Sequence, residues 1–489
     1  MKHRASYNSI LLAGARLFST ASSLLITMIL TKTLDLSANG TYAQCLVIIS
    51  VGLSIISLGL MEGSNYFFAK SKDKKEKQEY VSAILFLVYV SGLALAIILL
   101  LFRKSISNYF SNPTLSTLIF LIALHPMLAN LINVLNVLYI ATDRAKTVVF
   151  RNAAISLIHL LIVSITACTT KDVGMILLLY LLAEIVTDIF MLRSFSRAGY
   201  SVRLHLPSRT ILQRILQYCL PMAAYIAMNA FLRDTDKLII GWYETTEMQA
   251  VYSNCAKILP LDIISAAFYT ILVPQITQHI VHHRLDTARK IFANYLKVGL
   301  LSTATFALAI LLCPEETILF LYSADYLQGI TVFILYNFVE FIKFANVTIV
   351  ISAAGKTKIL MIVSATALIA NLVLSLVLYS WLGFVGPAVG TVIVTALTVA
   401  TLLILSANVL KTNIIHLLDW KFLGIYAVKT TIAICVCLLV KKALVQAGVL
   451  DWMILFAIIG LFCLIVLLSN LKQIKNTLSQ IDRSREEQL

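Results

Sequence analysis

Residues 41–45 read TYAQC, and residues 250–255, about 210 positions further along the chain, read AVYSNC. A second pair of segments has nearly the same separation: residues 141–147 read ATDRAKT, and residues 353–359 read AAGKTKI. Both pairs lie at equivalent ends of apolar segments, so they indicate that the second half of the chain duplicates the first. The alternative is chance similarity in a background rich in Leu, Ile and Val. A duplicated membrane protein of many helices is most often a transporter with its substrate site between the two repeats.

The composition predicts a membrane protein made of helices. Of its 489 residues, 60% are hydrophobic and only 13% are charged, whereas soluble domains are nearer half apolar and a quarter charged. Apolar runs long enough to cross the hydrocarbon core of a bilayer recur from end to end. The net charge of +15 does not indicate a nucleic-acid partner, because the charges lie in short segments between apolar runs. There they set membrane topology and contact anionic lipid headgroups.

The apolar runs predict fourteen transmembrane helices, arranged as two sets of six and a terminal pair. The first set is expected at residues 8–31, 40–62, 80–102, 115–140, 150–168 and 174–195. The second set is expected at residues 214–241, 250–278, 291–313, 326–352, 358–381 and 385–408, and the terminal pair at 420–440 and 450–470. The predicted fold is therefore an all-α polytopic membrane protein.

The repeat predicts the domain organisation. Six helices is an even number, so both copies have the same orientation and are expected to be related by a pseudo-two-fold axis along the membrane normal. The expected parts are an N-terminal six-helix lobe (1–198), a basic cytoplasmic linker (199–213), a C-terminal six-helix lobe (214–410), two additional helices (411–471) and a cytoplasmic tail (472–489).

The distribution of Lys and Arg predicts the orientation. If the N-terminus is cytoplasmic, most of the basic residues outside the helices fall on the cytoplasmic side. The opposite side holds only Lys32, Arg103, Lys104, Lys171, Lys441 and Lys442. Because positive charge accumulates on the cytoplasmic side, both termini are predicted to be cytoplasmic.

Several charged residues lie inside predicted helices, where an ionisable group needs a partner or a water-filled cavity. The strongest cluster reads RDTDK at residues 233–237. Arg233 and Lys237 are four residues apart, with Asp236 between them and Asp234 three residues before Lys237, so they share one helix face. The cluster is interpreted either as a self-neutralised structural network or as the polar wall of a central cavity.

Polar stripes on two further helices extend this interpretation. Asn337, Glu340, Lys343 and Asn346 follow one another at spacings of three in the tenth predicted helix. The fourth helix, its partner in the repeat, has asparagines at the same spacing, and Asn133 is at their centre. Facing cavity walls are one interpretation, and the alternatives are a Glu340–Lys343 ion pair and hydrogen bonds between helices.

Two other basic residues are assigned to the same cavity. Arg16 lies in the first helix without a nearby charged partner in the sequence, and Lys257 lies in the eighth helix. A cavity with surplus cations favours an anion, and Arg geometry suits phosphate or pyrophosphate. In the sixth helix, Glu184 and Asp188 are interpreted as facing cytoplasmic water, with a cation or proton site as the alternative.

No catalytic or metal-binding pattern occurs in the sequence. It contains no phosphate-binding glycine loop, no HExxH motif and no nucleophile elbow. No enzyme activity, metal site or cofactor is therefore predicted, apart from a coupling ion (H⁺ or Na⁺) that the sequence does not identify. The candidate site consists of substrate-binding residues: Arg16, Asn133, Arg233, Asp234, Asp236, Lys237, Lys257, Asn337, Glu340 and Lys343.

Taken together, these features resemble the polysaccharide (O-antigen or repeat-unit) flippases of the multidrug/oligosaccharidyl-lipid/polysaccharide exporter superfamily. The resemblance covers nearly the whole chain, including the basic loop 70–77, the segment DKLIIG at 236–241, the segment GKTK at 355–358 and the glycines at 383–390. It implies two bundles that work by alternating access. The implied substrate is an undecaprenyl-pyrophosphate-linked oligosaccharide, moved from the inner to the outer leaflet of the bacterial inner membrane for surface polysaccharide biosynthesis.

The resemblance also implies partners and a role for one residue. The expected partners are the lipid-linked glycan, membrane lipids and the polysaccharide polymerase machinery. Arg16 falls where related flippases of lipid-linked precursors carry a cavity arginine.

Three other functions remain open at this stage. A cation-coupled drug antiporter of the same superfamily would be expected to have mainly carboxylates in its cavity. A lipid II flippase would recognise the same pyrophosphate. A membrane glycan polymerase or glycosyltransferase would need a large outer loop or a cytoplasmic catalytic domain, which the sequence lacks.

Overall fold

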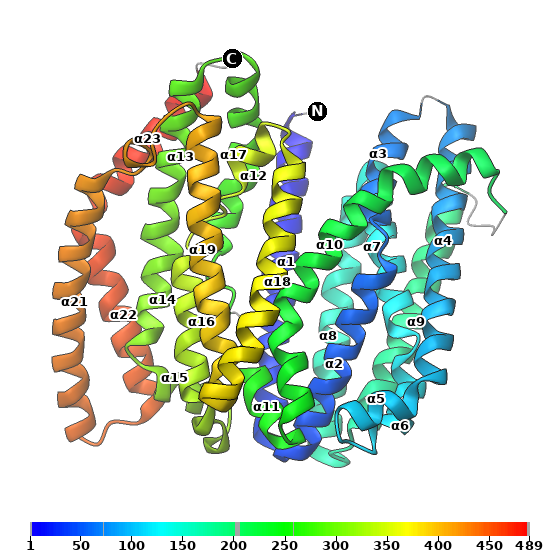
Figure 1. Cartoon of the computed structure of the whole chain (residues 1–489), viewed down its shortest axis with the longest axis horizontal. Coiled ribbons are helices and arrows are strands. Elements are labelled where there is room, and N and C mark those ends of the chain that lie inside the picture. The colour runs from blue at the N-terminus through cyan, green and yellow to red at the C-terminus, as the bar shows by residue number, and fades with distance from the viewer. Residues whose placement is uncertain (1, 72, 201–205, 258, 487–489) are drawn as a thin grey trace. The chain divides into compact units, whose positions relative to one another are not determined.

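The computed structural model describes residues 2–71, 73–200, 206–257 and 259–486, and all regular secondary structure in these residues is helical (Figure 1). The chain divides into two compact units, Met1–Val251 and Tyr252–Leu489. Arg203 and the rest of residues 201–205, in the predicted basic linker, lie outside the described residues. The predicted all-α polytopic class is confirmed.

Unit 1 contains the following helices: α1 (Lys2–Thr33), α2 (Leu36–Ile56), α3 (Leu60–Lys70), α4 (Lys74–Leu101), α5 (Arg103–Tyr109), α6 (Leu115–Ile122), α7 (His125–Ala141), α8 (Ala145–Thr169), α9 (Val173–Arg197) and α10 (Arg209–Tyr243). Helix α11 (Thr246–Cys255) crosses the boundary into unit 2. Within unit 1, α1 packs along α8, and α2 packs between α7 and α10. The helix predicted at 214–241, α10, thus makes its contacts with helices of unit 1.

The remaining elements belong to unit 2: α12 (Ile263–Val281), α13 (Leu285–Gly299), η1 (Leu300–Ala304), α14 (Thr305–Leu311), α15 (Pro314–Leu321), η2 (Ala324–Gly329), α16 (Ile330–Ile342), α17 (Ile349–Ala353), α18 (Thr357–Leu382), η3 (Gly383–Val385), α19 (Gly386–Val409), α20 (Ile414–Leu417), α21 (Trp420–Gln446), α22 (Asp451–Ser469) and α23 (Leu471–Glu486). The predicted tail 472–489 is therefore helical as far as Glu486, and residues 487–489 lie outside the described part.

Twelve candidate membrane spans are long and apolar enough to cross a bilayer in the described chain, against the fourteen predicted. One of the twelve, Thr357–Val409, includes both α18 and α19, which were predicted separately. The helix predicted at 326–352 is absent from the twelve because it is divided into η2, α16 and α17. The difference thus comes from a merged pair and a broken helix rather than from missing apolar sequence.

Short polar side chains define where several helices begin. The Asp35 carboxylate accepts a hydrogen bond from the backbone N–H of Ala38 at the start of α2, and Asp172 does the same for Gly174 in α9. Such caps satisfy N–H groups that have no partner within the helix. Between α2 and α3 the backbone turns through Gly59, whose positive φ of 64° suits glycine.

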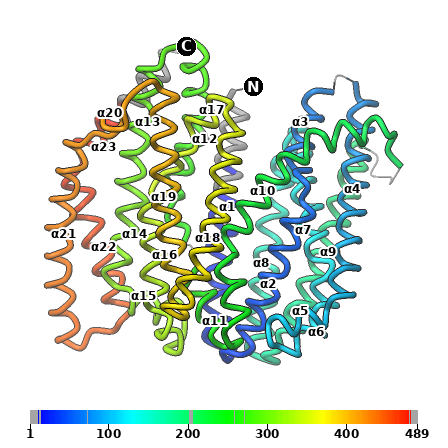
Figure 2. The backbone as a smooth tube through the Cα atoms, viewed as in Figure 1, coloured from blue at the N-terminus to red at the C-terminus, as the bar shows by residue number. Residues whose placement is uncertain are grey.

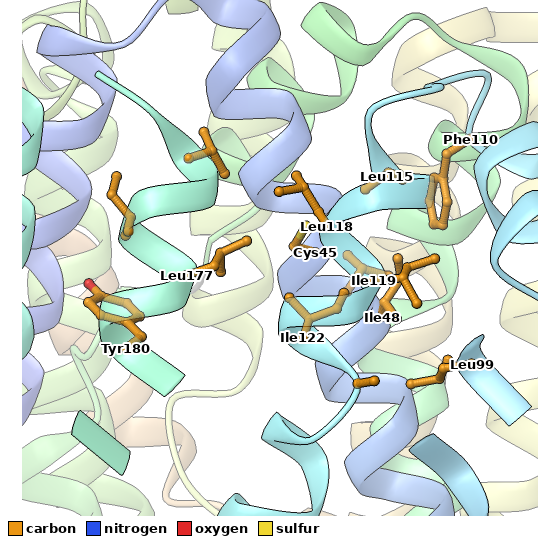
Figure 3. Packing of buried hydrophobic residues seen from close by; sticks show 14 of the residues in the cluster. Cys45, Ile48, Leu99, Phe110, Leu115, Leu118, Ile119, Ile122, Leu177 and Tyr180 are labelled. Carbon is orange, nitrogen blue, oxygen red and sulfur yellow. The ribbon is translucent and has the colours of Figure 1, made fainter. Parts of the chain in front are cut away.

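One of the two hydrophobic clusters of unit 1 forms where α2, α6 and α9 meet. Figure 3 shows Cys45 and Ile48 of α2 beside Leu118 and Ile122 of α6, with Leu177 of α9 in the same cluster. Each of these side chains is buried. Lipid tails are as apolar as leucine, so close packing rather than exclusion of water stabilises such contacts inside a membrane.

The terminal pair α21 and α22 packs into unit 2 against α14 and α15 (Figure 2). The hydroxyl of Tyr426 on α21 hydrogen bonds to the carbonyl of Leu300 at 3.0 Å, where α13 passes into the π-helical turn η1. At the N-terminus of α21, the ammonium of Lys297 lies 2.7 Å from the carboxylate of Asp419. Burial alone would raise the pKa of Asp419, but hydrogen bonds from Lys297 and from the Phe422 N–H hold it below its ordinary value.

Replacing Lys441 with alanine is expected to weaken the docking of the terminal pair. The Lys441 ammonium lies 2.8 Å from Glu316, a buried carboxylate of α15, and donates to the carbonyl of Leu312 at 3.0 Å. Leaving the Glu316 carboxylate unpaired should lower the free energy of unfolding by about 2–3 kcal/mol, because the ion pair is largely but not fully shielded from solvent. The measurement is thermal unfolding of the purified protein in detergent. Lys442→Ala, at the exposed neighbouring residue, is the control, and equal unfolding temperatures would contradict the assignment.

The orientation is testable by cysteine labelling. Lys75→Cys, in a background where the exposed Cys168 and Cys435 are replaced by serine, is expected to react with an impermeant maleimide only after cells are permeabilised. Lys171→Cys is expected to react in intact cells, because Lys171 lies on the side poor in basic residues. Labelling of Lys75→Cys in intact cells would reverse the orientation.

Candidate functional site

The predicted charge cluster on α10 is assembled around Asp234. Both carboxylates of the cluster are buried: Asp234 is 4% exposed and Asp236 is 2% exposed. Ser50 of α2 donates its hydroxyl to Asp234 at 2.7 Å, and the Lys237 ammonium donates to the other carboxylate oxygen at 3.1 Å. The backbone N–H of Lys237 donates to Asp236 at 2.9 Å. Asp234 therefore has a neighbouring helix and a cation as partners, which stabilises its charged form at membrane depth.

Arg233 is the exposed member of this cluster. Its guanidinium donates to the Ser50 hydroxyl at 3.0 Å and to Asp234 at 3.3 Å, while 57% of the side chain remains exposed. The formal charges of the two basic and two acidic residues cancel, but the two carboxylates are buried and the guanidinium of Arg233 is exposed. The accessible face of the cluster is thus cationic, with donors held in place by α2, an arrangement suited to an anion.

The structure brings Arg233, Asp234 and Lys237 into direct contact, and it adds Ser50, which the sequence analysis did not identify. Arg16 is exposed on α1, and the ion pairs of the described residues do not include it. Lys257 is half-buried in the non-helical stretch between α11 and α12. The prediction that Lys257 lies within a helix is therefore wrong, and the assignment of Arg16 and Lys257 to the cavity stays a prediction.

The polar stripe predicted on the tenth helix is wrong as a continuous helix face. Glu340 is buried within α16, but the helix ends at Ile342, so Lys343 and Asn346 lie beyond it in a turn. Among the described residues no ion pair within 4.0 Å joins Glu340 to Lys343, but the two charges still interact at longer range. Asn337 bonds within its own helix, donating to the Phe333 carbonyl at 2.9 Å.

The asparagines of the fourth predicted helix lie in α7 and have different surroundings. Asn130 donates to the carbonyl of Ile56, the last residue of α2, at 2.9 Å. Ile56 loses its helical partner there because the Leu60 N–H bonds to Ser57 instead. Asn130 therefore provides a hydrogen-bond donor for the last carbonyl of α2, as the alternative of hydrogen bonds between helices predicts. Asn133 is half-buried.

A second polar network, which the sequence analysis missed, links α2 to α11. Gln44 donates to the side-chain oxygen of Gln249 at 2.9 Å, and Asn112 donates to Gln44 at 2.7 Å and to Thr41 at 2.9 Å. Gln249 is fully buried. Gly40 permits this approach, because a Cβ there would lie 1.9 Å from the carbonyl oxygen of Thr246. The signal was present in the repeated segment 41–45, which contains Thr41 and Gln44.

The interpretation of Asp188 as facing cytoplasmic water is wrong. Asp188 is 2% exposed and lies 3.4 Å from the guanidinium of Arg151, on the neighbouring helix α8. Among the described residues, no group of three or more His, Cys, Asp or Glu side chains could hold a metal ion. The chemistry available on α10 is thus the binding of an anion by fixed donors, without a metal or a nucleophile.

A sequence comparison identifies related proteins. A family profile described as "Polysaccharide biosynthesis protein" matches residues 29–331, more than half of the chain. No protein of curated function matches the sequence significantly.

Solved transporter structures have a similar fold. The structure described as lipid II flippase MurJ in an inward closed conformation gives a TM-score of 0.71 at 16% identity, covering 95% of this chain and 100% of that one. An inward-facing multidrug resistance MATE family transporter of the MOP superfamily gives 0.62 at 16% identity, covering 80% and 94%. A MOP superfamily transporter from Pyrococcus furiosus gives 0.55 at 16% identity, covering 82% and 94%. At such identities the likeness establishes the fold alone.

Proposed function

Because the chain belongs to the polysaccharide biosynthesis protein family, we propose that it is a flippase for lipid-linked oligosaccharides. It has the fold of MOP superfamily transporters, and this fold supports a role as a transporter rather than as an enzyme. The proposed substrate is an undecaprenyl-pyrophosphate-linked repeat unit, moved across the bacterial inner membrane for surface polysaccharide biosynthesis. O-antigen repeat units are the specific class we favour.

The observation that carries this proposal is the exposed guanidinium of Arg233. Its position is set by Ser50 and Asp234, so little side-chain freedom remains to be lost when an anion binds. A planar guanidinium matches the paired oxygens of a phosphate group, whereas an ammonium acts as a point charge. A pyrophosphate is the part shared by all such lipid-linked glycans, which explains how one site can serve substrates with different sugars.

The remaining cations extend the same proposal. Lys237 lies one helical turn from Arg233 and contributes positive potential close to it. We assign Arg16, Lys257 and Lys343 to the same substrate path, together with Glu340, Asn133 and Asn337. The charge distribution supports cytoplasmic placement of both termini. Transport by alternating access of the two six-helix repeats, and association with polymerase machinery, complete the proposal.

The test combines a gene disruption with reconstitution. Cells lacking the gene should accumulate a lipid-linked glycan on the cytoplasmic face of the inner membrane. Purified protein in liposomes should then make that same lipid, labelled in the inner leaflet, accessible to a glycosidase added outside. Lipid II and a cationic drug are the comparison substrates. Movement of lipid II alone, or of the drug alone, would replace this proposal with one of the other two functions.

A further inference from the structure

Two stacked tyrosines join α3 to α10 on the surface of unit 1. The ring of Tyr66 on α3 lies parallel to the ring of Tyr218 on α10, with the centroids 4.2 Å apart and an interplanar angle of 11°. Tyr66 is 38% exposed, and Tyr218 is half-buried. Because Tyr218 covers one face of the Tyr66 ring, the exposed part of Tyr66 is its opposite face and its edge.

The packing of the two helices holds this tyrosine pair in place. Helices α3 and α10 are in direct contact (Figure 1). Gly59 permits the contact, because a Cβ there would lie 2.7 Å from the carbonyl oxygen of Cys219, the residue after Tyr218. The ring of Phe67 packs edge-on against both tyrosines, at centroid distances of 5.1 and 5.6 Å. The two rings are therefore fixed in advance, so a ligand that binds them loses little affinity to side-chain ordering.

Ionisable side chains flank Tyr66 on the same face of α3. Glu62 lies four residues before it and Lys70 four residues after it. The Lys70 ammonium donates to the Tyr66 hydroxyl at 3.2 Å. Glu62 lies within electrostatic range of Tyr218 and Cys219, and its Oε2 is buried without a hydrogen-bond partner among the described residues. An exposed aromatic ring thus lies between a carboxylate and an ammonium.

This face of α3 is not suited to contact with lipid chains. Tyrosines commonly anchor helices at membrane interfaces, and Tyr66 lies only four residues from Lys70, where its span ends. Glu62, however, lies eight residues from that end, which is about 12 Å along the helix. A carboxylate that faces hydrocarbon at such depth is costly. The face that carries Glu62 and Tyr66 is therefore expected to contact water or a polar ligand.

Helix α10 continues the polar surface towards the anion site. Tyr225 and Asn229 lie two and three turns after Tyr218, so the three residues share one face of the helix. Asn229 is exposed, and the exposed guanidinium of Arg233 follows one turn later. Tyr218 and Arg233 are separated by about 22 Å along the helix axis. The tyrosine pair is therefore too far from Arg233 to contact the same phosphate group.

The chemistry of the tyrosine pair suits a sugar. The C–H bonds on one face of a pyranose ring carry slight positive charge, and the face of an aromatic ring is negative. A carboxylate accepts hydrogen bonds from hydroxyl groups, and an ammonium donates to hydroxyl oxygens. An aromatic face with both groups beside it can bind the apolar face and the hydroxyl groups of one sugar residue.

We propose that Tyr66 and Tyr218, together with Glu62 and Lys70, bind a sugar of the transported glycan. The pyrophosphate binds at Arg233, and the tyrosine pair binds a sugar several residues away from it along the glycan. The identity of the substrate rests on the proposed function. Stacking on tyrosine tolerates different pyranoses, whereas the hydrogen bonds of Glu62 and Lys70 select among them by the positions of their hydroxyl groups.

The first experiment measures the Kd of three synthetic lipids for the full chain in nanodiscs. The lipids are undecaprenyl pyrophosphate without a sugar, with one N-acetylglucosamine, and with a linear β-1,4-linked tetrasaccharide of N-acetylglucosamine. The tetrasaccharide lipid is expected to bind about 5- to 10-fold more tightly than the one-sugar lipid, as expected for one aromatic stacking contact. Tyr66→Ala should abolish this difference without changing the Kd of the sugar-free lipid. Arg233→Ala should weaken the binding of all three lipids by the same factor.

Further variants separate stacking from structural effects. Tyr66→Phe keeps the aromatic ring and should retain most of the difference between the two glycolipids. Glu62→Gln keeps the shape of the side chain but removes its charge, and it should reduce the difference. Phe150→Ala is the matched control, because Phe150 is an aromatic residue of α8 in the same unit that is 71% exposed. Monodisperse elution in size-exclusion chromatography establishes that each variant is folded.

A second experiment tests the tyrosine pair without pyrophosphate. Saturation-transfer NMR with the free tetrasaccharide should detect binding to the unmodified protein and to Tyr66→Phe, but not to Tyr66→Ala. This measurement needs neither the lipid nor transport. If the free sugar binds in this way but none of the three lipids does, the result counts only against the proposed function.

Four outcomes would overturn the proposal. The first is the absence of free-tetrasaccharide binding to the unmodified protein, and the second is equal Kd values for the two glycolipids. The third is an equal loss of affinity for all three lipids in Tyr66→Ala, which would indicate a structural role. The fourth is loss of sugar binding when phosphatidylglycerol replaces phosphatidylcholine in the nanodiscs, which would assign this face to anionic lipid headgroups.

Discussion

Replacing Arg233 with alanine is expected to abolish glycan export while leaving the protein folded and present at near-normal levels. The side chain is exposed and contributes little to packing, but its guanidinium is the accessible cation of the α10 cluster. Losing one charged hydrogen-bond partner of a buried phosphate typically costs about 2–5 kcal/mol, which corresponds to a rate loss of at least about 30-fold. The measurement is surface polysaccharide in cells, together with flipping of the labelled lipid in liposomes.

Arg16 provides the companion variants. Arg16→Ala should also stop export, and Arg16→Lys should restore only part of it, because an ammonium does not reproduce the two parallel donors of a guanidinium. Arg209→Ala is the matched control, since Arg209 is an exposed arginine at the start of the same helix as Arg233. If alanine at both Arg16 and Arg233 leaves export intact, the two residues are structural and the anion site is elsewhere.

The second large effect is expected for Gly40→Val. A Cβ at this position would lie 1.9 Å from the Thr246 carbonyl oxygen, so the start of α2 and the start of α11 would have to separate. The separation would break the hydrogen bond between Gln44 and Gln249 and leave buried amides without partners. Overpacking of this kind typically costs about 1–3 kcal/mol or more. We expect a lower unfolding temperature in detergent and loss of export.

Gly14→Val is the matched control for this prediction. Gly14 also lies within a helix, α1, but a Cβ there would meet nothing within 4 Å. Both variants carry the same intrinsic cost of a β-branched residue in a helix, so the difference between them isolates the clash with Thr246. Equal unfolding temperatures for the two variants would show that α2 and α11 can separate without cost.

Much of the architecture was predictable because of the membrane itself. Backbone N–H and C=O groups in hydrocarbon have no water to bond and therefore favour continuous helices, so the length of an apolar run locates most spans. The same reasoning located the charge cluster on α10, since Asp234 and Lys237 are three residues apart and meet on one helix face. The family was predicted from the apolar segments and short motifs along the chain, and the family profile confirms it.

The helix breaks were not predictable by this reasoning. The turn after Ile342 moves Lys343 and Asn346 off the face that their spacing implies. An apolar helix can end inside a membrane only where neighbouring side chains satisfy its freed backbone groups, as Asn130 does for Ile56. Those neighbours are distant in sequence, and spacing within one segment carries no information about them.

Sequence alone therefore establishes a polytopic helical chain and the charged residues inside its apolar segments, and it predicts that the second half duplicates the first. Only the packed structure decides which charges are neutralised and which remain available. Ser50 meets Asp234 across 184 positions of the chain, and Gln44 meets Gln249 across 205. Helical periodicity shows which face of a segment is polar, but the partner of that face depends on how the helices pack. Packing made Arg233 an exposed cation and Asp188 a buried carboxylate, although both lie within helices that the sequence predicts to span the membrane.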